Sequence, residues 1–481
     1  MKPPIYTGVK NFISKQRIMF TTPGHNGKVI LKSRNFCKLD AASNFETDNL
    51  DTPGGYIVES EYKLSKIYGT YHSYYITNGT SCGIMAMIGS VLSPGDKIIV
   101  DRSCHKSVID AITLCRLVPV FVTREFNEQL GFFGGIDTYN LESVMSANRD
   151  AKALFITSPT YYGVISDVEQ IADLTYKHNM LLLVDESHGA HLPFSTALPK
   201  SALYCGADMV LHNAGETLGS MSGGAILHIN NDTINKDKVR KVVYTYQTPD
   251  TSNAYLCALE NSIYYANSRQ KRYTGLINEI DRCKSVINGG TDIVWFETDE
   301  QNKHDIFAND KTRIVINFAR IGLSGKEAGD ILRLRFGIEP EMADENNVVL
   351  VASLFNSSRD IRKLMTALIY IYKQFLKKKI KPLDEIPVSQ FSNNDIVLAS
   401  EPGNTMRCPS EWVGARDVEG RICKGTIYTY PTYFPLIIPG ERITTKHLQS
   451  MDLAVQNGER ICGLSQNGEF EVVNMTYSYR F

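Results

Sequence analysis

The chain has 481 residues, 43% of them hydrophobic, so it can bury a large core and is long enough for several structural units. Its 51 lysines and arginines are balanced by 52 aspartates and glutamates, which gives a formal net charge of -1. This balance gives no electrostatic reason to expect nucleic acid or an anionic membrane as a partner. No apolar run is long enough to predict a transmembrane helix.

The start of the chain lacks the apolar run of a secretory signal. The ten cysteines are scattered singly and form no CxxC pair, so we expect no metal site. Several of them lie in apolar segments, where cysteine behaves as a small hydrophobic residue. These features favour a reducing, cytoplasmic setting.

From about residue 70, short apolar runs alternate with amphipathic segments. Near-continuous apolar strands are typical of a parallel sheet covered by helices on both faces. The pattern predicts an α/β sandwich of seven or so strands. Its seven strands are expected at residues 73–77, 97–101, 118–123, 153–157, 181–185, 209–212 and 225–229.

The chain is expected to form an N-terminal arm at 1–29, a major domain at 30–285, a small α/β domain at 286–380 and a C-terminal α/β unit at 396–481. Residues 380–395 are polar and contain two prolines, as a linker would. The preceding basic run at 377–379 suits the dipole at the end of a helix, so we interpret it as a solvated helix end.

A possible phosphate site follows the first predicted strand. Strand 73–77 runs into Asn78-Gly79-Thr80-Ser81, where small residues expose backbone N–H groups at the start of a helix. Such a helix start favours a phosphate group. An N-cap by Thr80 or Ser81 explains the same residues equally well.

A second signal is Asp185, which ends an apolar strand and is followed by Glu186-Ser187-His188-Gly189-Ala190-His191. Ligands of open α/β sheets bind beyond the carboxyl ends of the strands. A carboxylate there can pair with a protonated ring nitrogen.

Several motifs, taken in order, resemble the ornithine/lysine/arginine decarboxylase family of fold type I pyridoxal-phosphate (PLP) enzymes. The resemblance covers nearly the whole chain and implies a PLP-type major domain with a mixed, mostly parallel seven-stranded sheet. By position, it implies that His105 stacks on the pyridine ring, Asp185 faces the ring nitrogen and His188 lies near the reactive side. It also implies that Thr80 and Ser81 hold the phosphate. The motifs are Thr22-Pro23-Gly24-His25, Ser103-Cys104-His105-Lys106-Ser107, Ser158-Pro159-Thr160-Tyr161-Tyr162-Gly163, Asp185 to His191, Glu419-Gly420-Arg421-Ile422 and Ile438-Pro439-Gly440-Glu441.

The segment that resembles the cofactor-lysine motif departs from the family pattern. Family members read roughly Ser-x-His-Lys-Thr-Leu, whereas this chain reads Asn213-Ala214-Gly215-Glu216-Thr217-Leu218. The flanks align without a gap, so Glu216 is expected at the lysine position, with Asn213 and Gly215 at positions that contact cofactor phosphate in the family. A carboxylate cannot form a Schiff base, so any bound PLP would not be covalently attached.

Glu216 also adds a negative charge near Asp185. Two like charges about 4 Å apart repel by about 4 kcal/mol at an effective dielectric constant of 20. Protonation of Glu216 or a cationic partner would relieve this repulsion.

Two further segments resemble family features. Gln247 to Asn253 resembles an interface loop, in which Thr251 and Ser252 would reach the cofactor phosphate of a neighbouring subunit. Tyr433 and Phe434 stand where the family usually has Pro-Pro-Gly, and they either reshape the rim of the site or are surface aromatics.

The leading hypothesis is a catalytically inactive pseudoenzyme that acts as part of a homodimer, a larger oligomer or a heteromer with an active relative. A second hypothesis is an active decarboxylase or lyase that lacks the covalent lysine and moves protons through His105 or His188. A third is a module that binds an amino acid or polyamine, with Asp185, Glu186 and Glu216 facing a cationic group.

Overall fold

The computed structural model describes residues 3–28, 36–41, 47–127, 130–248, 251–298, 306–376, 396–456 and 459–474. The predicted linker at 380–395 and the basic run at 377–379 lie outside these ranges.

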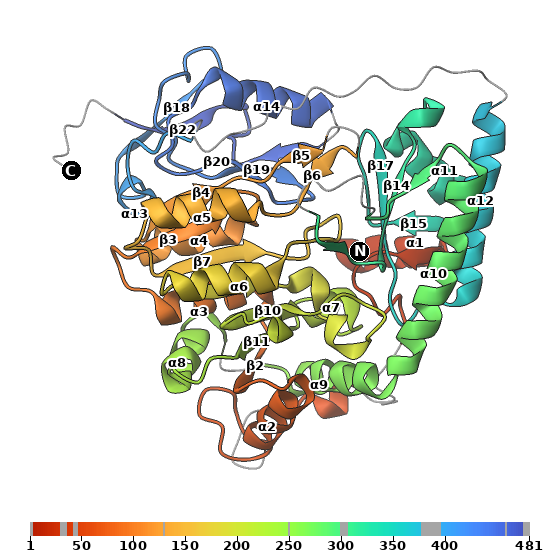
Figure 1. The fold of residues 1–481 in the computed structure, drawn as a ribbon, viewed down its shortest axis with the longest axis horizontal. Helices are drawn as coiled ribbons and strands as arrows, with labels where there is room; N and C mark the ends of the chain where they lie inside the picture. The colour runs from red at the N-terminus through yellow and green to blue at the C-terminus, as the bar shows by residue number, and fades with distance from the viewer. Residues whose placement is uncertain are drawn as a thin grey trace.

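A seven-stranded sheet forms the centre of the major unit, in the order β2-β11-β10-β9-β7-β3-β4 (Figure 1). β11 runs antiparallel to both of its neighbours, and the other pairings are parallel. The predicted fold class, a mixed and mostly parallel sheet with helices, is therefore confirmed. The strands are β2 (His72–Ile76), β3 (Lys97–Asp101), β4 (Val118–Val122), β7 (Ala153–Thr157), β9 (Leu181–Asp185), β10 (Met209–Asn213) and β11 (Ala225–Ile229).

The two faces of this sheet are buried in two separate hydrophobic clusters. In β9, Leu182 and Val184 belong to one cluster and Leu183 belongs to the other, and all three are fully buried. Burial on both faces explains why these strands read as continuous apolar runs. The Leu183 side is covered by α3 (Gly79–Val91), α4 (Lys106–Cys115) and α8 (Lys236–Tyr246), and the other side by α2 (Tyr56–Tyr68), α5 (Thr138–Ala147) and α6 (Val168–Lys177).

A smaller antiparallel sheet has the order β12-β14-β17-β16. Ile314 and Ile316 of this sheet belong to the same hydrophobic cluster as Leu182, so the two units share a continuous core. Its strands are β12 (Val294–Trp295), β14 (Arg313–Asn317), β16 (Met342–Ala343) and β17 (Asn347–Val351), and the neighbouring helices are α10 (Gln270–Gly290), α11 (Gly325–Arg335) and α12 (Ser358–Leu376).

The N-terminal arm is tied to both units. Its strand β1 (Ile18–Phe20) pairs in parallel with β15 (Ile338–Pro340) of the smaller unit. The backbone N–H of Gly24 donates to the carbonyl oxygen of Gly215 over 3.0 Å. The remaining elements of this part are α1 (Pro4–Ile13), α7 (Ala214–Thr217), α9 (Asn253–Ser268), β5 (Phe126–Asn127), β6 (Phe132–Phe133), β8 (Val164–Ile165) and β13 (Ala308–Asn309).

The C-terminal unit, blue in Figure 1, lies beside the β3–β4 edge of the main sheet. The guanidinium of Arg102, just after β3, donates to the carbonyl oxygens of Pro435 and Leu436 and lies 3.5 Å from the carboxylate of Glu441. These contacts fix the hairpin β19–β20 above the end of the sheet. The unit contains α13 (Pro402–Thr405), α14 (Thr445–Gln456), β18 (Ser410–Val413), β19 (Ile427–Tyr430), β20 (Pro435–Ile437), β21 (Arg460–Cys462) and β22 (Phe470–Val473).

The exact domain limits remain a prediction. Within the described ranges, none of the helices combines the length and apolar character that crossing a membrane requires.

We predict that Gly24→Ala destabilises the fold, because an added Cβ would lie 2.4 Å from the carbonyl oxygen of Glu216. Overpacking of this kind costs about 1–3 kcal/mol. Gly8→Ala is the matched control, since nothing lies within 4 Å of its added Cβ and Gly8 is inside α1. Urea unfolding should show a loss for the first variant and no loss for the control. Equal stability of the two variants would contradict this packing.

Candidate ligand-binding site

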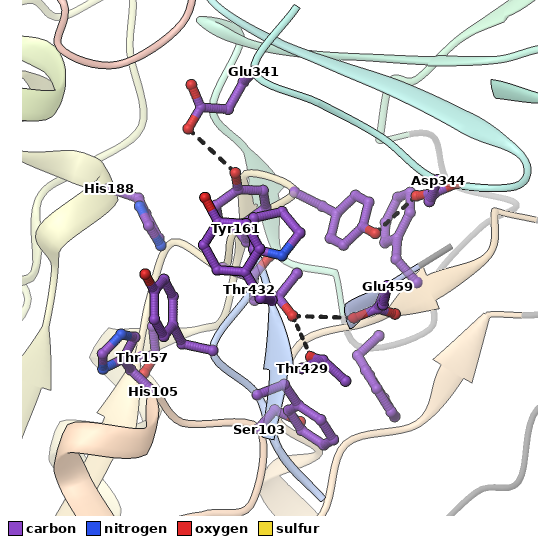
Figure 2. Close-up of a pocket in the computed structure, with 18 of the residues that line it drawn as sticks. Ser103, His105, Thr157, Tyr161, His188, Glu341, Asp344, Thr429, Thr432 and Glu459 are labelled. Carbon is purple, nitrogen blue, oxygen red and sulfur yellow. Dashed lines mark hydrogen bonds between the residues drawn. The ribbon is translucent and has the colours of Figure 1, made fainter. Parts of the chain in front are cut away.

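A cavity of about 800 Å³ is lined by residues from all three units and the N-terminal arm (Figure 2). The ends of β7 and β9 meet it from the main sheet, as expected for a ligand site at the carboxyl edge of parallel strands. The lining includes Thr22, Thr80, His105, Arg124, Phe132, Thr157, Tyr161, Tyr162, Asp185, His188, Glu216, Glu341, Asp344, Asn346, Thr429, Thr432, Tyr433, Phe434 and Glu459.

Glu216 is positioned by the short helix α7 that follows β10. The Oδ1 atom of Asn213 accepts the backbone N–H groups of Gly215 and Glu216 over 3.1 and 3.2 Å. The Nδ2 atom of Asn213 donates to Oε1 of Glu216 over 3.0 Å. Asn213 therefore caps α7 and holds the Glu216 carboxylate.

The other carboxylate oxygen of Glu216 is held by two nitrogen groups. Nη2 of Arg313 and Nδ1 of His188 both lie 2.7 Å from Oε2 of Glu216. Nη2 of Arg313 also lies 2.7 Å from Nδ1 of His188. Depending on the tautomer of His188, its Nδ1 either donates to Glu216 or accepts from Arg313. The Arg313 side chain is 1% exposed, which makes this a buried charge pair between the main and smaller units.

This pairing decides the ionisation of Glu216. Burial by itself would raise the pKa of the carboxyl, but His188 and Arg313 together lower it from 4.5 to about 2. The repulsion expected between Glu216 and Asp185 could be relieved by protonation of Glu216 or by a cationic partner. The structure shows the cationic partner, which is Arg313. Burial raises the pKa of Asp185, and the side-chain and backbone hydrogen bonds from Ser187 act in the opposite direction.

His105 and His188 lie on the same side of the cavity in Figure 2. Nδ1 of His105 is 2.7 Å from the hydroxyl of Ser107, and the His105 ring lies 5.1 Å from the Tyr433 ring. Burial, with a contribution from Lys106, lowers the pKa of His105 to about 4. His105 is therefore neutral near pH 7, which suits a stacking role.

The two residues predicted to hold a phosphate, Thr80 and Ser81, differ in their relation to the cavity. Thr80 lines the cavity, whereas Ser81 is not among the described residues that line it. The alternative prediction, that Thr80 or Ser81 is the N-cap, is wrong, because both lie inside α3 and Asn78 is at the N-cap position. The described contacts give Asn78 no capping hydrogen bond. The hydroxyl of Thr251 lies 3.0 Å from the hydroxyl of Thr77 in the same chain, beside this helix start and away from the cavity lining.

Two other interpretations change with the structure. Glu186 does not face the cavity, because its buried carboxylate accepts from Ser201, from the N–H of Ala202 and from His212. Tyr433 and Phe434 line the cavity, so they are not simple surface aromatics.

Sequence reasoning missed Arg313 and a group of acidic residues. Arg313 opens an otherwise apolar strand, and this unusual charge was the available signal. Glu341 and Asp344 lie in the acidic run 339–345, which could have been noticed by composition. Glu459 had no local signal, because it comes to the cavity from the C-terminal unit.

A family model for the Orn/Lys/Arg decarboxylase major domain matches residues 3–308, which is more than half of the chain. The chain belongs to the Orn/Lys/Arg decarboxylase family.

Relatives within this family align over most of the chain. The arginine decarboxylase of Bacillus subtilis (strain 168) is 29% identical over 473 residues, and that of Halalkalibacterium halodurans is 29% identical over 453 residues. Each alignment covers 92% of this chain and 92% of the relative.

Solved structures of decarboxylases show the same fold. The lysine decarboxylase LdcF of Francisella novicida has a TM-score of 0.76 at 16% identity, covering 92% of this chain and 75% of that chain. The constitutive lysine decarboxylase of Escherichia coli has a TM-score of 0.72 at 16% identity, covering 98% and 82%. A structure of SPT with PLP has a TM-score of 0.56 at 13% identity, covering 75% and 88%.

The decarboxylase-family cavity fits the ring of PLP but not its covalent attachment. His105 offers a neutral stacking surface, and Asp185 offers a carboxylate for a ring nitrogen. No lysine is found among the described residues that line the cavity. Lys106, next to His105, is directed to Asp110 and to the Tyr428 ring. A covalently held PLP therefore does not fit the residues present.

The described residues also contain no group of three or more His, Cys, Asp or Glu side chains that could hold a metal ion. Arg124 contacts the cavity, but its Nε and Nη2 donate to Asp101. Nη2 also donates to the carbonyl oxygen of Thr157, and Nη1 donates to that of Gly134.

We predict that Glu216→Gln lowers the free energy of unfolding by on the order of 3 kcal/mol at pH 7, because the variant mimics a protonated Glu216. A carboxyl whose pKa is lower in the folded state stabilises the fold above its unfolded pKa. For Glu216 this contribution is complete above about pH 4.5 and is lost as the pH falls through about 2. Urea unfolding of both proteins should therefore show a constant difference above pH 5 that shrinks below it. A difference independent of pH would contradict the ion pair.

Proposed function

We propose that this chain is a pseudoenzyme of the Orn/Lys/Arg decarboxylase family, which binds a ligand in the cavity and acts within an oligomer. The observation that carries the proposal is the Glu216 carboxylate, held at both oxygens by Asn213, His188 and Arg313. The motif resemblance implies that this carboxylate stands where the family has its lysine, which supports the proposal. An amine is needed for a Schiff base, and a carboxylate held by an arginine cannot replace it.

The geometry supports the pseudoenzyme better than an active lyase without the lysine. A proton-transfer group works best when its pKa is near the operating pH. The pKa of His105 is lowered to about 4, and one ring nitrogen of His105 is taken up by Ser107. His188 is held between Glu216 and Arg313.

An exposed apolar surface on α1 supports assembly with a second copy of the chain. The helix has no buried residue within the single chain. Ile5, Val9 and Ile13 are spaced four residues apart, so they share one face of the helix, and all three are exposed. Exposed apolar patches of this kind mark interaction surfaces. A heteromer with a lysine-bearing relative would use the same surface.

The cysteines support the proposed cytoplasmic setting. All ten are free, and Cys82, Cys104, Cys205, Cys283, Cys408 and Cys423 are buried. Free buried cysteines suit a reducing compartment.

We predict that the purified protein does not bind PLP covalently. After incubation with PLP, its spectrum should lack a Schiff-base band, and borohydride should trap no PLP on a lysine in mass spectrometry. Release of carbon dioxide from arginine, lysine and ornithine should be undetectable. A trapped lysine, for example Lys106, or measurable decarboxylation would overturn the proposal. The Bacillus subtilis arginine decarboxylase is the positive control.

We predict that the chain is at least a dimer at micromolar concentration in sedimentation experiments. Val9→Asp should shift it toward monomer, because a charge on the exposed face of α1 cannot be buried without cost. Tyr176→Asp is the matched control, since Tyr176 is 86% exposed on α6, away from this face. Monomer in the unmodified protein would remove the oligomer claim. Co-expression with an active relative tests the heteromer separately, by copurification and by a change in that relative's activity.

A further inference from the structure

One end of the cavity carries acidic side chains that lack a cationic partner. In Figure 2, Asp344 and Glu459 lie on the side away from His105 and His188. Glu341 accepts from the backbone and hydroxyl of Thr22 and from the hydroxyl of Tyr161. These donors are neutral.

The other two acids also have neutral donors. Asp344 accepts from the hydroxyl of Tyr162 over 2.8 Å, and Glu459 accepts from the hydroxyl of Thr432 over 3.4 Å. Within the described ranges, no lysine or arginine forms an ion pair with Glu341, Asp344 or Glu459. Burial raises the pKa of Asp344 and of Glu459, and the charge of Lys326 opposes this rise at Glu459.

Two unpartnered polar atoms in the same cavity point independently to a ligand. Oδ1 of Asn346 and Oγ1 of Thr157 are buried without a hydrogen-bond partner, although both residues line the cavity. Asn346 is 6% exposed and Thr157 is 9% exposed. Unsatisfied buried polar atoms are rare in folded proteins and require an explanation. A ligand N–H group near Asp344 would satisfy Asn346.

Aromatic side chains form a wall next to these acids. The rings of Phe132 and Tyr162 are stacked with centroids 4.7 Å apart, and both line the cavity. Tyr161 lies between this wall and His188, with its ring centroid 5.6 Å from that of His188. Such a surface accommodates an alkyl chain and stabilises a cation placed over its rings.

Among the described residues that line the cavity, no lysine or arginine is free to pair with a carboxylate. Arg313 is paired with Glu216, and Arg124, the other arginine here, is paired with Asp101. Arg124 is also the one arginine or lysine among the described residues that line the cavity. An α-carboxylate brought into this acidic space would be desolvated without a cationic partner, which is strongly unfavourable.

We infer that the cavity binds a diamine or an aminoguanidine that lacks an α-carboxylate, in preference to the amino acid of the same side chain. One cationic group binds at Asp344 and Glu459, and the alkyl chain lies along the aromatic wall. This inference rests on the proposed function, because a family member that does not decarboxylate has no need to bind an amino acid. Glu216 has a direct part in this preference, since it occupies the arginine that would otherwise attract a carboxylate.

Three matched ligand pairs test the inference, because each differs by the carboxylate alone. They are agmatine and arginine, cadaverine and lysine, and putrescine and ornithine. Isothermal titration of the full chain, without added PLP, should show at least one decarboxylated ligand binding about tenfold or more tightly than its amino acid. Equal affinities, tighter binding of the amino acids, or no binding of any ligand at millimolar concentration would overturn the inference.

Variants separate the two ends of the site. Asp344→Asn and Glu459→Gln should each weaken binding of the preferred amine, whereas Glu142→Gln, a change of an exposed glutamate on α5, should not. Glu216→Gln should narrow the preference for the amine over its amino acid by strengthening binding of the amino acid. Circular dichroism checks that each variant is folded, and the ligand pairs on the unmodified chain test the inference without any variant. Unchanged binding in both folded acidic-end variants would overturn the location.

The two proposals fail in different experiments. Covalently bound PLP or measurable decarboxylation would contradict the proposal that the chain is a pseudoenzyme. The ligand preference would then still be decided by the titrations. If the chain has no covalent PLP but binds amino acids more tightly than amines, the pseudoenzyme proposal stands and the inferred amine site is wrong.

Discussion

The charge pair between Glu216 and Arg313 is the interaction on which the cavity depends. It joins α7 of the main unit to β14 of the smaller unit, and it is buried, so its partners cannot separate without a large desolvation cost. His188 lies within hydrogen-bond distance of both partners. Glu216 is thus a stabilised part of the fold.

The same pair sets the electrostatics of the whole cavity. By neutralising Arg313, Glu216 leaves the space with acidic groups at one end and neutral histidine and aromatic surfaces at the other. The family fold is kept, with Asp185 at the edge of the main sheet.

The cavity also depends on how three units are joined. Arg102 fixes the C-terminal hairpin over the end of β3, and the continuous hydrophobic cluster fixes the smaller unit against the main sheet. The acids come from these two added units, whereas Asp185 and His188 come from the main sheet. Changes in the packing of either unit would therefore alter ligand binding without touching the residues that resemble the cofactor site.

The sequence alone determined the strands of the main sheet, because burial on both faces forces continuous apolar runs such as Leu181 to Val184. It also indicated the residues near the ring site, since Asp185 and His188 lie in one local motif. The acidic end was decided by the tertiary structure, because Asp344 and Glu459 are far apart in the chain and line the same cavity through the packing of separate units. The pairing of Glu216 with Arg313 could not be predicted from the sequence either, because residues 97 positions apart leave no local pattern. This ion pair depends on how β14 packs against α7.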